Sequence, residues 1–230
     1  LGDNMQENLF FVSPVYCEDK PEFLEKVDKA CDKHIEASKT TNSYISEMNK
    51  RMEILGEDFK KVKDFAWSSH SWSIANDEDC IELRDYIVKK SYSILVRQGF
   101  DMKPFDLAIS EFWVQEFPKL GGGHHDTHIH YNNHISGFYF LKCSEKTSKP
   151  VFHDPRPAAL MSKLPYQDEK TATIGSDKIT LNVKPGSLVI FNGYLPHQFT
   201  VDYGLEPFRF IHFNLQALPK NLIIKEKNYE

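Results

Sequence analysis

The sequence predicts one domain of mainly β structure, an α+β fold in which short strands form a barrel or sandwich and helices pack on its outside. The chain has 230 residues, which is enough to bury one large core. Apolar residues recur at helical spacing before residue 106, and beyond it alternation, aromatic residues and turn pairs dominate. We therefore expect a single domain over 1–230, with 1–105 as helical and edge-strand support and 106–218 as the β core.

The N-terminal part is expected to supply one edge strand and two helices. Residues 8–16 are apolar and rich in β-forming side chains, and Pro14 favours an edge position because proline cannot donate a hydrogen bond to a neighbouring strand. A helical pattern of apolar residues follows Pro21, and a second one spans 78–98. The polar segment 39–62 is predicted to be a loop with partial helix.

The C-terminal part contains seven predicted strands separated by turn pairs such as Pro185-Gly186 and Asn192-Gly193. Short strands at this spacing are typical of barrels and sandwiches. The last two are expected to form a hairpin, because only a short DYGLEP segment joins them. The predicted strands are 106–117, 135–142, 150–153, 178–183, 187–191, 197–201 and 208–216.

Composition excludes several classes of protein. A formal charge of −5 offers no basic surface for nucleic acid and disfavours binding to anionic lipid. The sequence contains no run of 18 apolar residues, so no membrane span is predicted, and the N-terminus lacks the layout of a signal peptide. The cysteines are scattered without a CxxC pair, so a reducing cytoplasm is the expected location. They are Cys17, Cys31, Cys80 and Cys143.

Histidines are concentrated in the β part of the chain. Eight of the ten lie between positions 124 and 212, and five of them fall in the segment GGGHHDTHIHYNNH. Histidine is the commonest metal ligand among side chains, so this density indicates a metal site. His128 and His130 are two residues apart, and in an extended segment such side chains project from one face, roughly 7 Å apart at their Cα atoms. His197, which begins a predicted strand, is the candidate third ligand.

Other interpretations of these histidines stay open. A single histidine is more often a hydrogen-bonding residue than a ligand, and only the combination of the pair with His197 favours a metal. His124 and Asp126 form a competing HxD pair, because the usual facial triad for non-haem iron contains two histidines and one carboxylate. The second ligand is therefore either His130 or a member of the HxD pair.

Arg209 is the candidate anchor for an anionic ligand. In the predicted hairpin it lies about three residues along the strand from His197, roughly 10 Å away. A five-carbon dicarboxylate that chelates the metal at one end would place its far carboxylate there, and a guanidinium can bind a carboxylate through two hydrogen bonds. A surface ion pair is the alternative role for Arg209. His212 and Trp113 are expected around the ligands rather than on the metal.

Taken in order, these segments resemble a family of 2-oxoglutarate/Fe(II) oxygenases of bacteria and phages. The order is HxH at His128 and His130, then SGFYFL, VFHDPRP and PGSLVIFNGYLPH, and finally an arginine followed by HFN. An early segment ending in PVY and Trp113 ahead of the histidines also fit, so the resemblance covers nearly the whole chain. Each motif is modest, and their order makes the set specific.

The resemblance implies a double-stranded β-helix (jelly roll) that uses Fe(II), 2-oxoglutarate and O2 to oxidise a substrate, by hydroxylation or a related reaction. Carried over by position, the metal ligands are His128, His130 and His197, and Arg209 holds 2-oxoglutarate. Better-known relatives have aspartate at the position of His130.

Three positions depart from the family pattern. Tyr131 replaces the proline that usually follows HxH. Phe140 stands where many oxygenases have a tyrosine that touches 2-oxoglutarate, so Tyr139 is the candidate substitute. Arg209 lies one residue closer to the FN pair than in the family, which shifts the strand face on which it is expected.

Two further functions are compatible with the same residues. One is a three-histidine dioxygenase in which the substrate itself chelates iron and no 2-oxoglutarate is used. The other is a binding module with a structural metal, although a structural zinc site is usually closed and four-coordinate, and Gly121–Gly123 beside the histidines predict an open segment. The sequence leaves the substrate and the oligomeric state open.

Overall fold

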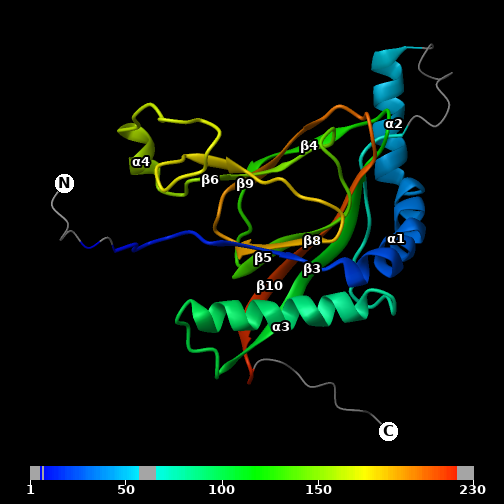
Figure 1. Ribbon diagram of the computed structural model, residues 1–230. Helices are drawn as coiled ribbons and strands as arrows, with labels where there is room; N and C mark the ends of the chain where they lie inside the picture. The colour runs from blue at the N-terminus through cyan, green and yellow to red at the C-terminus, as the bar shows by residue number, and fades with distance from the viewer. Residues whose placement is uncertain (1–5, 7, 57–65, 222–230) are drawn as a thin grey trace, which may run out of the picture.

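Two antiparallel sheets face each other in the computed structural model, which describes residues 6, 8–56 and 66–221 (Figure 1). The larger sheet has the strand order β1-β8-β5-β10-β3-β2, and the smaller has the order β4-β9-β6-β7. The strands are β1 Val15–Asp19, β2 Ser69–His70, β3 Phe105–Phe117, β4 Gly123–His128, β5 Ile135–Lys142, β6 Pro150–His153, β7 Lys178–Thr180, β8 Ser187–Asn192, β9 His197–Asp202 and β10 Phe208–Pro219.

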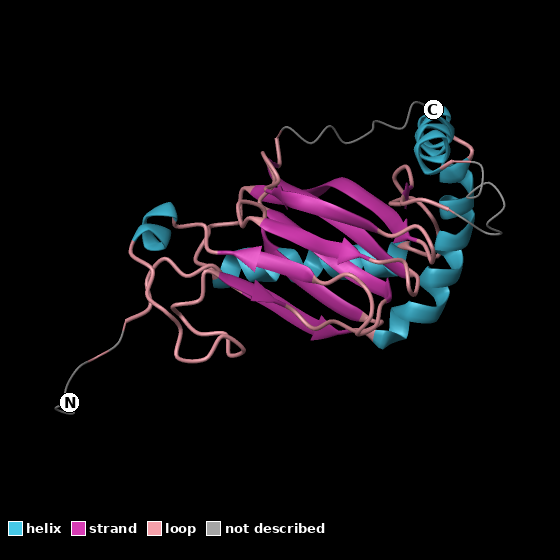
Figure 2. Cartoon of the chain, turned by 90° about the horizontal axis from the view of Figure 1, so that it is seen from above, coloured by secondary structure: helices cyan, strands magenta, loops and turns pink. Residues whose placement is uncertain are grey.

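Helices cover the outer side of the larger sheet, and in Figure 2 they lie beneath and beside the strands. The main ones are α1 Leu24–Lys39, α2 Asn42–Leu55 and α3 Ile81–Arg97, with a 3₁₀ turn at Pro21–Phe23 and a short α4 at Pro157–Met161. The threonine hydroxyl of Thr41 accepts from the Tyr44 amide and caps α2. None of the described helices is both long and apolar enough to cross a membrane.

Two apolar cores lie on opposite faces of the larger sheet. The outer core, between this sheet and α1 and α3, includes Tyr139, Ile211 and Phe213. The inner core lies between the two sheets. We call its aromatic part the phenylalanine core, and each of its members is at most 4% exposed. They are Phe117, Phe138, Phe140, Phe152, Phe191, Phe199, Phe208 and Phe210.

The double-stranded β-helix that the resemblance implied is confirmed by this architecture. Six of the seven predicted strands coincide with β3, β5, β6, β8, β9 and β10 to within three residues at each end. The seventh, 178–183, is shortened to β7. The alternation of side chains along β10 explains why both cores need apolar residues, because its even-numbered residues Phe208 and Phe210 point inward and its odd-numbered ones point outward.

Several expectations about local structure were wrong. The predicted edge strand at 8–16 begins only after Pro14, at Val15, although β1 is indeed an edge strand. Segment 39–62 contains a regular helix, α2, and its residues 57–65 lie outside the described part of the chain. The sequence patterns also missed the two-residue β2 and the strand β4 within the histidine segment.

The predicted hairpin of the last two strands does not form. β9 pairs with β4 and β6 in the smaller sheet, whereas β10 pairs with β3 and β5 in the larger one. The DYGLEP connection therefore carries the chain from one sheet to the other. A short connection suggests that the two strands it joins pair with each other. In a structure of two stacked sheets, however, it can equally lead from one sheet to the other.

Gly137 in the SGFYFL motif has a packing role. A Cβ atom at this position would lie 2.2 Å from Cζ of Phe213 and 2.4 Å from the Val189 carbonyl oxygen. The absence of a side chain lets β5 approach its neighbours β8 and β10 while Phe213 occupies the outer face. This motif therefore reflects the fold rather than the chemistry of the site.

Candidate metal centre

Three histidine side chains converge at the open end of the barrel. His128 ends β4, His197 begins β9, and the two are direct partners in the ladder. His130 follows in the loop beyond β4, where its amide donates to the Gly193 carbonyl at 2.9 Å. One ligand atom from each side chain lies within 4.8 Å of the other two. Such a group can bind one divalent metal, because metal–nitrogen distances of about 2 Å require only a modest closing of the three rings.

The Nε2 atoms of His128 and His197 are unprotonated and can therefore bind a metal ion. Nδ1 of His128 lies 2.7 Å from the Asp126 carbonyl oxygen, and Nδ1 of His197 lies 2.9 Å from that of Leu195. A carbonyl only accepts, so both Nδ1 atoms carry the proton. Each Nε2 is left unprotonated, and its lone pair is held in position by the backbone contact on the far side of its ring.

His130 is held differently, by Asn214 of β10. The Asn214 side-chain amide donates from Nδ2 to Nδ1 of His130 at 3.0 Å, so the proton of this ring is on Nε2, which lies 3.2 Å from Nε2 of His197. Binding a metal through Nε2 moves the proton to Nδ1, which then needs an acceptor. Nδ2 of Asn214 also donates to Oε2 of Glu111 at 2.8 Å, so rotation of the amide would set its oxygen against that carboxylate, and the Glu111 carboxylate is itself the acceptor available beside this ring.

Replacing Asn214 with leucine is expected to weaken metal binding about tenfold, because loss of a group that orients a ligand histidine typically costs 10–100-fold in affinity. Titration calorimetry with Co(II) measures this change. Ser136 offers a matched control, since it faces Asn214 across the β5–β10 ladder and its buried hydroxyl has no partner. Ser136→Ala is expected to bind Co(II) like the wild type. Equal affinities for both variants would remove Asn214 from the site.

Burial keeps His130 and His197 neutral, which is the form that binds a metal. Desolvation is the main cause that lowers the pKa of His197 to about 2 and that of His130 to about 3. The same cause lowers the pKa of the neighbouring His125 to about 4. These rings therefore carry no charge at neutral pH, and no proton competes with a metal ion there.

A second group, Glu111, His130 and His212, also brings its ligand atoms within 4.8 Å of one another. Its composition, two histidines and a carboxylate, is that of the usual iron triad. It shares His130 with the first group. We favour the first group because His128 and His197 both present Nε2 lone pairs fixed from behind, whereas Nε2 of His212 faces the Glu111 carboxylate at 3.3 Å. Sequence reasoning overlooked Glu111 and Asn214.

His212 and Trp113 lie beside the centre, as expected from their positions. The ring centroids of His212 and His130 are 4.7 Å apart, and those of His212 and Trp113 are 4.6 Å apart. Trp113 also contacts the ring of His70 on β2. On the inner side of the centre, Phe191 lies 4.7 Å from the His197 ring and closes the barrel below it. The centre thus sits above a water-free interior.

Arg209 does not face this centre. Its Nε donates to Oε2 of Glu116 at 2.7 Å, and its Nη1 donates to Oδ1 of both Asp28 and Asp32 of α1, at 2.8 and 2.7 Å. It therefore points outward from β10, toward the helices. The spacing argument placed it wrongly because it depended on the hairpin with β9. The shift of one residue relative to the FN pair is the signal that already indicated the other strand face.

Tyr139 is also turned away from the centre. It is fully buried in the outer core, where its hydroxyl donates to the Lys20 carbonyl at 2.7 Å. Its neighbour Phe140 points inward instead. The prediction that Tyr139 replaces a ligand-binding tyrosine is therefore not supported, since adjacent residues of a strand project to opposite faces.

The competing HxD pair does not join the other histidines. His124 and Asp126 lie 3.6 Å from each other, and both side chains are largely exposed. Neither belongs to a group of converging ligand atoms among the described residues. The geometry thus favours His130 over this pair as the second ligand.

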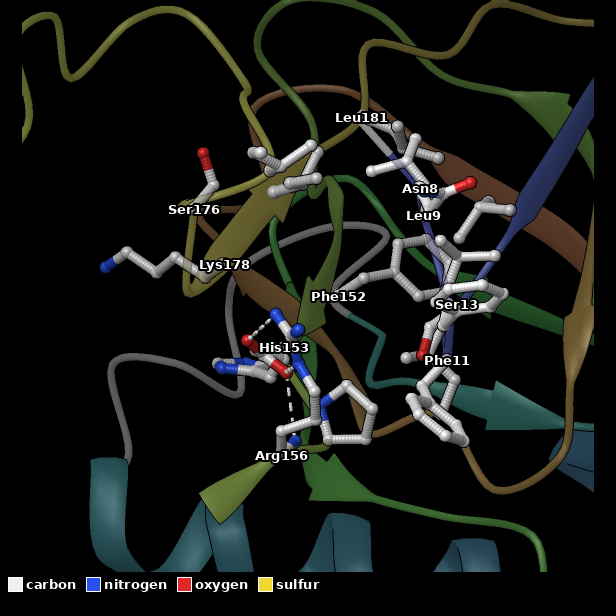
Figure 3. Close-up of a pocket in the computed structure, with 18 residues that line it drawn as sticks. Asn8, Leu9, Phe11, Ser13, Phe152, His153, Arg156, Ser176, Lys178 and Leu181 are labelled. Atoms are coloured by element: carbon white, nitrogen blue, oxygen red, sulfur yellow. Dashed lines mark hydrogen bonds and ion pairs between the residues drawn. The ribbon is translucent and has the colours of Figure 1, made fainter. Parts of the chain in front are cut away.

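An open cleft of about 600 Å³ lies one layer of side chains away from the centre, and Figure 3 shows the residues that line it. The segment 8–15 forms one wall, and β6, β7 and the following loop form the other. Phe152, whose ring lies 6.1 Å from that of His197, separates the cleft from the histidines. At its rim Arg156 binds Asp154 through Nε and Nη2, so VFHDPRP is a salt-bridged turn rather than part of the metal centre.

Comparisons with known proteins agree with this geometry. Residues 111–214 match a family described as "Putative 2OG-Fe(II) oxygenase", a range that includes all three histidines. No protein with a curated function matches the chain in sequence.

Solved structures of two prolyl hydroxylases and of a third protein share the fold. A prolyl-4-hydroxylase from Pseudomonas putida aligns with a TM-score of 0.50 at 10% identity, covering 88% of this chain and 91% of that one. A prolyl hydroxylase from Trichoplax adhaerens, in complex with a hypoxia inducible factor peptide, gives 0.52 at 12% identity and covers 88% and 83%. AviO1 from Streptomyces viridochromogenes gives 0.54 at 10% identity and covers 89% and 90%.

Proposed function

We infer that this chain, whose residues 111–214 match the 2OG-Fe(II) oxygenase family, is a single-domain oxygenase that oxidises its substrate with O2 at one Fe(II) ion. The family implies Fe(II) and 2-oxoglutarate as cofactors. The observation that carries the inference is the convergence of His128, His130 and His197 within the matched segment. Three ligands on one side of the ion leave positions open for a chelating cosubstrate and for O2.

Each residue around the centre has a defined task in this function. His128 and His197 bind the metal through Nε2, and Asn214 orients His130. When bound, Fe(II) and 2-oxoglutarate supply the oxidising chemistry. Phe138 and Phe191, whose rings lie 5.6 and 4.7 Å from that of His197, exclude water from the inner side. The substrate must therefore approach from the open end of the barrel.

The test is consumption of 2-oxoglutarate by Fe(II)-loaded protein in the presence of O2. We expect slow formation of succinate even without the substrate, at millimolar 2-oxoglutarate. The reaction should stop when oxygen or iron is removed and in the variant His197→Ala. Bound iron without any succinate above the iron-free control would contradict the proposal.

The proposed partners are 2-oxoglutarate, O2 and an organic substrate rather than nucleic acid, since the net charge is −5. The proposed location is the reducing cytoplasm. It is supported by four cysteines that are all free in the structure.

A further inference from the structure

Among the residues that the structure describes, none places a cation in the barrel interior where it could bind a second carboxylate. Lysine and arginine occur at only three positions in β3 to β10, namely Lys142, Lys178 and Arg209. Arg209 binds carboxylates of α1 and β3 on the outer face, and Lys142 lies within 4.0 Å of Asp28 and Glu116 on that same face. Lys178 pairs with His153 at the exposed end of the smaller sheet.

The inward positions of β10 are apolar where an anchoring cation would be needed. Phe208 and Phe210 are fully buried between the sheets and pack against Phe199, with ring centroids 5.4 and 4.6 Å away. Burying a carboxylate among such side chains without a partner costs several kcal/mol. The phenylalanine core therefore both fills the space and repels the charge.

The polar end of the interior does not replace the missing cation. His212 is the next inward residue of β10, but the Glu111 carboxylate lies 3.3 Å from its Nε2. A second carboxylate beside Glu111 would meet a like charge. His125, which is half-buried, already contacts Oε1 of Gln115 through Nε2 at 2.8 Å.

We propose that Phe208 and Phe210 make this centre indifferent to the second carboxylate of its 2-oxo acid, so that 2-oxoglutarate binds through its chelating end alone. The inference rests on the proposed function. It implies that the centre accepts 2-oxo acids whose far end is uncharged as readily as 2-oxoglutarate. A salt bridge at that end would instead favour 2-oxoglutarate about tenfold or more, because a hydrogen bond to a charged group is worth about 1.5–3 kcal/mol.

The experiment compares 2-oxoglutarate with 2-oxopentanoate, which has the same chain length and lacks the second carboxylate. Both are titrated anaerobically into the Fe(II)-loaded protein, and the visible charge-transfer band of the chelate reports binding. We expect the two dissociation constants to agree within about threefold. Failure of both acids to bind the Fe(II)-loaded protein would overturn the inference together with 2-oxoglutarate dependence, and would favour a substrate that chelates iron itself.

A clear preference for 2-oxoglutarate, tenfold or more, would overturn this inference and leave the proposed function intact. Protein that binds no Fe(II) would overturn both. The variant Phe208→Arg adds a gain-of-function arm, since it places a guanidinium on the inward face of β10. If it folds, it should bind 2-oxoglutarate about tenfold more tightly than 2-oxopentanoate; the wild-type ratio decides the question in any case.

Discussion

Replacing His197 with alanine is expected to lower the affinity for Fe(II), or for Co(II) as a stable substitute, by about 100-fold or more. Loss of a group that merely orients a ligand already costs 10–100-fold, and here a ligand itself is removed. His197 is 1% exposed, and its Nδ1 is fixed on the Leu195 carbonyl, so no neighbouring side chain can take its place. Anaerobic titration calorimetry measures the change directly.

His124→Ala is the matched control for this prediction. His124 lies in the same histidine segment, on the exposed side of β4 beside Asp126. Its removal should leave the affinity unchanged, because its ring takes no part in either group of converging ligand atoms. A large loss in His124→Ala with little change in His197→Ala would move the metal to the HxD pair.

Replacing Arg209 with methionine is expected to destabilise the fold by about 3 kcal/mol while leaving metal affinity unchanged. Removal of one partner of a buried ion pair typically costs 3–5 kcal/mol, because the other charge stays buried. The buried charge left without its partner is that of Glu116, because only 9% of this residue is exposed. Asp28 and Asp32 are more exposed and can turn to water, which places the expected loss at the lower end of that range.

Urea unfolding of the metal-free protein measures the stability of this variant. Lys184→Met provides the comparison, because Lys184 also pairs with a carboxylate, that of Asp19 at 2.7 Å, but both side chains are exposed at the surface, where ion pairs contribute little. Its unfolding curve should overlay that of the wild type. If Arg209→Met were as stable as the wild type and instead lost 2-oxoglutarate binding, Arg209 would be the anchor that the sequence suggested.

The strands and the ligand cluster could be predicted because their signals are local. Alternation in SGFYFL and in PGSLVIF defines β5 and β8, and the HxH spacing brings His128 and His130 to one side of the chain. The position of Arg209 depends instead on which strand lies beside β10, and a DYGLEP connection is compatible with either a hairpin or a crossing. Pairing between distant segments is a tertiary property that local patterns leave undetermined.

Glu111 and Asn214 are site residues that local sequence patterns could not identify, for the same reason. They lie 103 residues apart in sequence and are joined by a hydrogen bond of 2.8 Å. Glu111 belongs to no motif, and Asn214 is the last residue of the HFN motif, which by itself indicates no role for it. Only the pairing of β3 with β10 brings them to His130 and gives them a role.

The crossing between β9 and β10 has a mechanical consequence. His128 and His197 belong to the smaller sheet, whereas Asn214, which holds His130, belongs to the larger one. At the open end of the barrel a bound ion would therefore link the two sheets. The phenylalanine core joins them at the other end. Any tightening of the metal's ligand set draws the sheets together, and any separation of the sheets loosens it. We therefore expect metal binding and the packing of the two sheets to stabilise each other.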